Sequence, residues 1–412
     1  MRTMLFNKII IKDFEPLKDE WLLIYNDTHY IVNGETKFII NEIKKYKSIT
    51  KSLPSFNKKY NSNIKLDEYK KLIKLLFQKF DIPLKGDETF NKKKSYIKNK
   101  VQLLNPKMSK ILAKIFNPLF EKRIFYISLL FLFVTNLILL IIFNAISFQE
   151  KIPEFISIIL IILPGIILHE LGHVSACEKF QVKNGGIGIG RYIIFPVFYS
   201  DVTRIWTLNK NERIIVNLAG IFMQLIYITS LIILYIIFDN KVFLTASALL
   251  FIDSLFQLFP FIRSDGYWVF SDFTGIYNLK KKSRDVIFDF LKHKKNLKSN
   301  KTLILIIYGL IDYGLVFFYI YTLIFKNWTQ FISFPNKLFQ ILLEFSKLNF
   351  KTIEISLAFL TYCFLYLFIF SSIFNFLSMQ FSKRRKSWNV GIQVFFLFFL
   401  LPASFKTILL WI

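Results

Sequence analysis

The chain has 412 residues, of which 54% are hydrophobic and 18% aromatic, and its mean hydropathy is +0.43. These values exclude an ordinary soluble domain of this size and predict a polytopic α-helical membrane protein. The formal net charge of +26 would also suit a nucleic-acid-binding protein. Most Lys and Arg residues, however, lie in the first 120 residues and in short loops beside apolar segments, where the positive-inside rule expects them. We therefore expect no nucleic-acid partner.

Residues 1–100 are predicted to form a separate cytosolic domain, because no apolar run at the N-terminus is long enough for a signal peptide. The segments Trp21–Tyr25 and His29–Val32 flank a turn and predict a β-hairpin. Helical spacing of apolar residues follows, and it predicts three helices: one after Gly34, one over Ile49–Tyr60 and one over Asp67–Phe80. Two strands followed by three helices indicate a small winged-helix-like α/β domain.

The segment that joins this domain to the membrane is basic at first and then amphipathic. Lys92–Lys100 is predicted to be a linker, and Met108–Phe120 a helix on the inner membrane surface, so that residues 101–122 form an interfacial segment. After it come seven apolar segments, each close to the ~20 residues that a membrane-crossing helix requires. These predicted spans are residues 124–147, 152–176, 214–238, 242–262, 303–325, 353–376 and 390–405.

The basic residues of the loops predict the orientation of the spans. With the N-terminus inside, the inner loops 177–213, 263–301 and 382–388 carry 6, 10 and 4 Lys and Arg residues. The outer loops 148–151, 239–241 and 326–351 carry 1, 1 and 4. This asymmetry predicts a multi-pass membrane protein with a cytoplasmic N-terminus and an outside C-terminus.

An HExxH motif, HELGH, lies near the inner end of the second predicted span and comprises His169, Glu170 and His173. Histidines four residues apart share one face of a helix, so both imidazoles can bind one metal ion. Glu170 then lies where it can take a proton from a water molecule. Two histidines and a glutamate that only packed inside an apolar helix would be costly. We therefore predict one Zn²⁺ per chain, with Glu170 as the catalytic base.

A hydrolytic zinc site needs a third protein ligand and one open position. Cys177 continues the four-residue spacing, but it lies ~12 Å along the helix axis from His169, which is too far. Asp265, at the cytosolic end of the fourth span, is expected at the depth of the two histidines and is the preferred ligand, although it could instead cap a helix. Asp253, in the middle of the fourth span, is a rival ligand, but its depth favours pairing with a polar neighbour.

Three blocks of the sequence resemble the site-2 protease family of intramembrane zinc metallopeptidases, in particular its bacterial branch of peptide zinc metalloproteases. The blocks are HELGH at 169–173, NLAGIFMQ at 217–224 and QLFPFIRSDG at 257–266, and the resemblance covers about residues 110–300. It implies that His169, His173 and Asp265 bind zinc and that Gln224 or Gln257, which replace asparagines common in the family, orients the substrate. It also implies a membrane-embedded hairpin at 185–206, whose edge can bind an extended substrate as an added strand.

The N-terminal domain is similar in pattern to PqqD-like peptide-recognition domains of ribosomal-peptide maturation systems. This resemblance implies that residues 1–100 hold the leader of a precursor peptide and so raise its concentration near the zinc. The alternative is a winged-helix domain that serves only as a structural cap or contacts lipid.

These expectations describe an intramembrane zinc endopeptidase whose core is residues 123–301, with residues 302–412 adding further transmembrane helices. The predicted reaction is hydrolysis of a peptide bond in or near the inner half of the membrane, and the expected partners are a peptide or protein substrate and membrane lipids. The alternative is a non-catalytic membrane peptide receptor, or an export or immunity component, in which zinc is structural or absent.

Overall fold

The structure is a computed structural model that describes residues 9–15, 19–25, 28–80, 82, 97–145, 149–192, 195–261, 263–291, 299–346, 354–356, 362–363 and 366. The chain divides into two compact units. The first comprises Met1–Ile111 and Cys177–Arg213, and the second comprises Leu112–Ala176 and Ile214–Ile412.

The N-terminal part of the first unit begins with an antiparallel sheet of three strands in the order β1-β2-β3. The strands are β1 (Ile10–Glu15), β2 (Glu20–Tyr25) and β3 (Thr28–Val32), and Trp21 of β2 lies opposite Val32 of β3. The predicted hairpin is therefore confirmed. β1 was not predicted, because this short strand carries the adjacent charges Lys12 and Asp13 and has no clear apolar alternation.

Three helices follow the sheet as predicted: α2 (Gly34–Tyr46), α3 (Ile49–Tyr60) and α4 (Leu66–Lys79). The starts of α2 and α3 are fixed by caps, since the Asn33 side chain accepts a hydrogen bond from the Thr36 amide and the Ser48 side chain accepts one from the Lys51 amide. Apolar side chains of the sheet and helices form one buried core, which includes Leu23, Ile39, Ile43, Tyr69, Ile73 and Phe77. This part of the chain thus has its own hydrophobic core. Its likeness to winged-helix domains stays a prediction.

The first unit contains a second antiparallel sheet, in the order β4-β6-β7. β6 (Ile187–Tyr192) and β7 (Phe195–Ser200) form a hairpin inside the segment 185–206, and β4 (Ile97–Leu104) pairs with the other edge of β6. The sequence placed the start of β4 in a linker, because its lysines hide the strand pattern. The depth of this hairpin in a membrane stays a prediction.

The amphipathic stretch forms the helix α5 (Pro106–Phe116) and a short 3-10 turn at Asn117–Phe120. Met108, Ile111 and Ile115 are exposed on α5, while Ser109 and Ala113 are buried. The helix is therefore two-faced as predicted, and its position on a membrane surface stays a prediction.

Five helices in the described part of the chain are long and apolar enough to cross a membrane. They are α6 (Lys122–Ile142), α7 (Ile152–Lys179), α8 (Lys210–Phe238), α9 (Lys241–Leu258) and α12 (Asn300–Ile320), and they coincide with the first five predicted spans. The sixth predicted span lies almost wholly, and the seventh entirely, outside the described residues. At the start of the sixth, Glu354–Ser356 forms β8, which pairs with β5 (Gln149–Lys151). A count of about seven spans is thus not confirmed.

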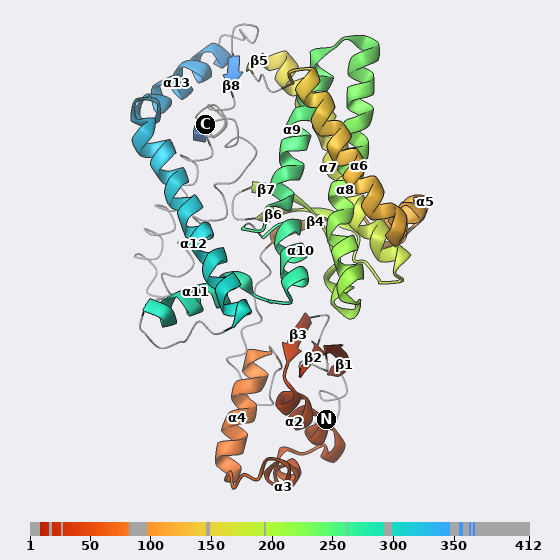
Figure 1. The fold of residues 1–412 in the computed structure, drawn as a ribbon, viewed down its shortest axis with the longest axis vertical. Coiled ribbons are helices and arrows are strands. Elements are labelled where there is room, and N and C mark those ends of the chain that lie inside the picture. The colour runs from red at the N-terminus through yellow and green to blue at the C-terminus, as the bar shows by residue number, and fades with distance from the viewer. Residues whose placement is uncertain are drawn as a thin grey trace. The chain divides into compact units, whose positions relative to one another are not determined.

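Helices α6, α7, α8 and α9 lie side by side in the second unit (Figure 1). Polar side chains tie them together: the Asn136 amide donates to the Leu225 carbonyl at 3.1 Å, and the Tyr227 hydroxyl donates to the Ile161 carbonyl at 2.8 Å. Gly172 of α7 lies against the Ala219 carbonyl of α8, where a Cβ atom would overlap that oxygen. Small residues of this kind let helices in a membrane approach closely.

The remaining helices of the second unit are α10 (Asp265–Thr274), α11 (Leu279–Leu291) and α13 (Trp328–Ser346), with a π-helical turn at Tyr321–Lys326. Ser283 of α11 donates to the Leu305 carbonyl of α12 at 2.8 Å. Lys280 and Asp312 form an ion pair of 3.4 Å between the same two helices. These contacts fix α12 beside the segment that follows α9.

We expect that Ile73→Ala lowers the free energy of unfolding of the N-terminal core by about 2–5 kcal/mol, because Ile73 is fully buried and its loss leaves a cavity. Leu75→Ala is the matched control on the same helix, since Leu75 is 60% exposed. Pulse proteolysis of the purified full-length protein across a urea series measures both. Equal urea midpoints for the two variants would contradict the packing described for α4.

Candidate metal centre

The two histidines of the HELGH motif lie on the buried face of α7, with His169 at 5% and His173 at 6% exposure. They are one helical turn apart, and their Nε2 atoms are separated by 3.2 Å. The close approach of α7 to α8 at Gly172 covers this face with α8. Both imidazole rings therefore lie on the face of α7 that packs against α8.

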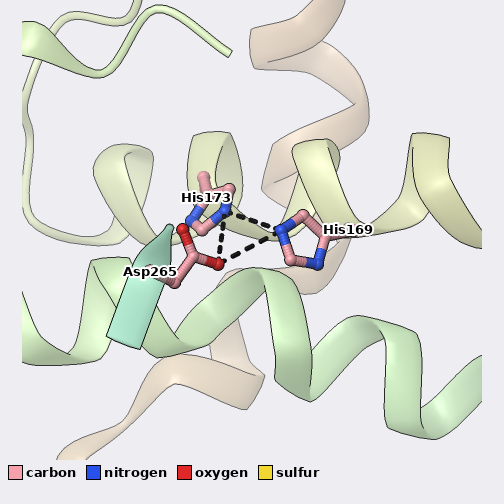
Figure 2. A group of neighbouring side chains, drawn as sticks. All are labelled: His169, His173 and Asp265. Atoms are coloured by element: carbon pink, nitrogen blue, oxygen red, sulfur yellow. Dashed lines mark hydrogen bonds and ion pairs between the residues drawn. The ribbon is translucent and has the colours of Figure 1, made fainter. Parts of the chain in front are cut away.

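Asp265 reaches the histidines from the first turn of α10 (Figure 2). The turn before it is held by the Ser264 hydroxyl, which donates to the Gln257 carbonyl at 3.1 Å, and by the Tyr308 hydroxyl, which donates to the Pro260 carbonyl at 2.9 Å. Gly266 is required next to Asp265, because a Cβ atom there would overlap the Leu258 carbonyl. The carboxylate is thus placed by a braced turn rather than by a free loop.

The three side chains form a nearly equilateral triangle of ligand atoms. Asp265 Oδ2 lies 3.2 Å from His169 Nε2 and 3.3 Å from His173 Nε2, and the two Nε2 atoms are 3.2 Å apart. Figure 2 shows the three side chains turned toward one another. Zinc ligands bound tetrahedrally at about 2.0–2.1 Å stand about 3.3–3.4 Å from one another. The triangle therefore has the size that a zinc ion requires.

Hydrogen bonds at the far side of each imidazole determine which nitrogen faces the triangle as a lone pair. His169 Nδ1 lies 3.0 Å from Gln224 Oε1, and His173 Nδ1 lies 2.7 Å from the Val216 carbonyl oxygen. Both partners are acceptors, so each Nδ1 carries a proton, and in the neutral ring Nε2 is then left as a lone pair. Asp265 Oδ2 is buried and accepts no hydrogen bond from any described residue. Three electron-pair donors face one another, which is the arrangement that binds a cation.

The electrostatics of the Asp265 carboxyl agree with this role. Burial by itself raises its pKa, whereas a protonated His173 or His169 beside it would hold the pKa below its usual range. Its place in the first turn of α10 also favours the ionised form, because the helix dipole is positive there. The carboxylate is therefore ionised and available to a metal ion at neutral pH.

Gly220 of α8 lies directly opposite the triangle. A Cβ atom at this position would be 2.5 Å from His173 Nε2 and 2.6 Å from His169 Nε2. Val216, Gly220 and Gln224 recur every four residues and thus lie along one face of α8. We call this face the α8 stripe. The stripe supplies two hydrogen-bond acceptors and, between them, the space into which the histidines point.

The structure also places the other residues that the sequence singled out. Glu170 follows His169 on α7, is partly buried, and lies within electrostatic range of both histidines. Asp253 accepts a hydrogen bond from Gln224 Nε2 at 2.9 Å, so the expected pairing with a polar neighbour is confirmed. The thiol of Cys177 is buried and does not join the group of ligand atoms, which are His169, His173 and Asp265 among the described residues.

The two glutamines expected to orient substrate have different surroundings. Gln224 is fully buried, and its amide contacts His169, Asp253 and the Leu250 carbonyl. Gln257 is partly buried, and its side chain makes no hydrogen bond within the described ranges. Sequence reasoning missed the contact of Gln224 with His169 and the role of Gly220. The four-residue spacing of the α8 stripe could have shown that Gly220 and Gln224 share a face, but not that this face contacts the histidines.

We expect Gly220→Ala to weaken zinc binding by about tenfold or more, because the new methyl group would meet both Nε2 atoms. Gly314→Ala on α12 is the matched control, since nothing lies within 4 Å of a Cβ atom there. Alanine favours a helix over glycine at both positions, so a loss at one position alone reports on the metal centre. The number of zinc ions per chain after dialysis, measured by mass spectrometry, compares the two variants. Full zinc content in Gly220→Ala would contradict this geometry.

Comparison with known proteins agrees with this chemistry. No family model matches the chain, and no solved structure matches it. A curated relative from Bacillus subtilis (strain 168), named "Putative peptide zinc metalloprotease protein YydH", is 29% identical over 220 residues, which cover 50% of this chain and 85% of the relative. The resemblance to zinc metalloproteases is thereby supported, whereas the likeness to PqqD-like domains is not shown. Together with the triangle of His169, His173 and Asp265, this relative supports a zinc metalloprotease role for the chain.

Proposed function

We propose that the chain is an intramembrane zinc endopeptidase that hydrolyses a peptide bond in or near the inner half of a bacterial cytoplasmic membrane. The observation that carries this proposal is the buried triangle of His169, His173 and Asp265, because it occurs on and beside helices long and apolar enough to cross a membrane. Ionisable groups at such places are costly unless they have a function.

The proposed chemistry follows from the side chains around the triangle. Zinc held by His169, His173 and Asp265 would supply a Lewis acid that polarises the substrate carbonyl and makes water more acidic. The Glu170 carboxylate takes a proton from the attacking water and passes it to the amine nitrogen as the C–N bond breaks. One water molecule is consumed, and the products are a carboxylate and an amine.

Substrate orientation is assigned to Gln257 rather than to Gln224. The amide of Gln224 is fully buried and engaged by three partners. The amide of Gln257 makes no hydrogen bond to the rest of the described chain. Gln257 lies at the end of α9, the helix that precedes Asp265 in the chain. An amide that is not engaged can donate to and accept from a peptide backbone.

The proposed substrate is a peptide or protein, and a ribosomally made precursor peptide is the class that the N-terminal domain would serve. That domain has a core of its own, and the outer edges of β1 and β3 pair with no other described strand. An extended peptide can add to such an edge through backbone hydrogen bonds. Binding there would raise the concentration of the precursor near the zinc.

We expect Glu170→Gln to keep one zinc ion per chain while cleavage falls by about 10²–10⁴-fold, because the amide cannot accept the proton from water. Asp265→Ala is the paired variant and is expected to lose both zinc and cleavage. The assay uses the purified protein reconstituted with a library of apolar transmembrane peptides, and products are read by mass spectrometry. Undiminished cleavage by Glu170→Gln would end the proteolysis proposal, and zinc binding without cleavage in the unchanged protein would favour a non-catalytic peptide receptor.

A further inference from the structure

Gln224 and Asp253 form a buried hydrogen-bonded chain that ends at a predicted metal ligand. Gln224 Oε1 lies 3.0 Å from His169 Nδ1. On its other side, Gln224 Nε2 donates to Asp253 Oδ2 at 2.9 Å and to the Leu250 carbonyl oxygen at 3.3 Å. The chain thus runs from α9 across α8 to the histidine of α7.

The direction of every hydrogen bond in this chain is determined by its α9 end. A backbone carbonyl can only accept, so the Leu250 carbonyl requires the NH₂ group of Gln224 to face it, and Asp253 Oδ2 accepts from the same group. The oxygen of Gln224 then has to face His169, and Nδ1 of that ring has to carry the proton. The remaining nitrogen, Nε2, is left as a lone pair pointing at the triangle. The His173 ring is oriented by a single hydrogen bond, in which its Nδ1 donates to the Val216 carbonyl.

Packing alone does not account for these residues. Gln224 is fully buried among apolar side chains of α8, and Asp253 lies in the middle of α9. An amide and a carboxylate at such places cost free energy unless each polar atom has a partner and a use. The amide has three partners, and one of them is the ring that must present its other nitrogen to a metal ion.

We propose that Gln224 and Asp253 are a positioning pair that fixes His169 in the tautomer and orientation that bind zinc. Asp253 and the Leu250 carbonyl determine the orientation of the Gln224 amide. The Gln224 oxygen in turn determines the orientation of the His169 ring. The pair does not touch the reacting atoms. This inference rests on the metal centre of the proposed function, but it does not depend on proteolysis.

Zinc affinity of the full-length protein in detergent tests this pair, by competition with a chromophoric chelator. Gln224→Leu is expected to weaken zinc binding by about 10–100-fold, which is the usual effect of losing a partner of a ligating histidine. The double variant Gln224→Glu with Asp253→Asn exchanges amide and carboxylate, so that the amide at 253 donates and the carboxylate at 224 accepts from His169. We expect it to bind zinc about tenfold more tightly than Gln224→Leu.

Thr229→Val is the matched control. Thr229 lies on the same helix and donates to Asn136 Oδ1 at 3.1 Å. Its loss therefore also removes a partly buried hydrogen bond between two membrane-crossing helices, but it leaves the partners of His169 unchanged. We expect this variant to keep the zinc affinity of the unchanged protein. Melting temperatures of the metal-free proteins show whether Gln224→Leu and Thr229→Val are folded to the same extent.

The possible outcomes test the Gln224–Asp253 pair, the metal centre and the proteolysis proposal separately. Equal zinc affinity in Gln224→Leu and Thr229→Val would overturn the proposed pair. An exchange variant as weak as Gln224→Leu would also overturn it, because a carboxylate at 224 that accepts from His169 should restore the ring orientation. Absence of zinc from the unchanged protein would remove the metal centre itself. Tight zinc binding with the predicted order of variants, but without cleavage of any peptide, would support the pair and reject the proteolysis proposal.

Discussion

Three ligand atoms of the candidate metal centre lie close enough for their lone pairs to repel one another, and the helix bundle has to hold them together. His169 Nε2, His173 Nε2 and Asp265 Oδ2 lie 3.2–3.3 Å from one another, and with both imidazoles neutral all three present lone pairs. In a buried site of low polarity such an arrangement is unfavourable without a cation at its centre. The surrounding protein therefore has to hold the atoms together when no cation is present, and the binding of a cation in turn stabilises the fold.

That holding is done by contacts between helices rather than by the motif itself. Gly172 and Gly220 leave room for α7 and α8 to approach, and the Val216 carbonyl and Gln224 use the same approach to orient the rings. Since lipid tails are as apolar as the helix surfaces, close packing and buried hydrogen bonds drive such association instead of the hydrophobic effect. The same contacts thus serve both the stability of the bundle and the geometry of the metal centre.

The metal centre was largely predictable from sequence because its signals are local or are fixed by membrane depth. HELGH places two ligands on one helical face, and the count of basic loop residues put Asp265 at the same depth, where the structure indeed brings it to the histidines. The partner of Gln224 was not predictable in this way, since the contact with His169 depends on the rotation of α8 about its own axis. β1 and the start of β4 were missed because charged residues interrupt their apolar alternation, and pairing with distant strands alone makes them strands.

The late position of Asp265 in the chain has a consequence for the biogenesis of the protein. His169 and His173 are synthesised 96 and 92 residues before Asp265, and α8 and α9 lie between them. The turn before Asp265 is moreover held by the hydrogen bond from the Tyr308 hydroxyl to the Pro260 carbonyl, and Tyr308 lies later still in the chain, on α12. During synthesis the two histidines alone would bind zinc weakly, and the triangle closes only after the later helices have inserted and packed. Under the proposed function, a newly made chain would therefore be inert toward peptide bonds, including those of its own unfolded segments, until its bundle is complete.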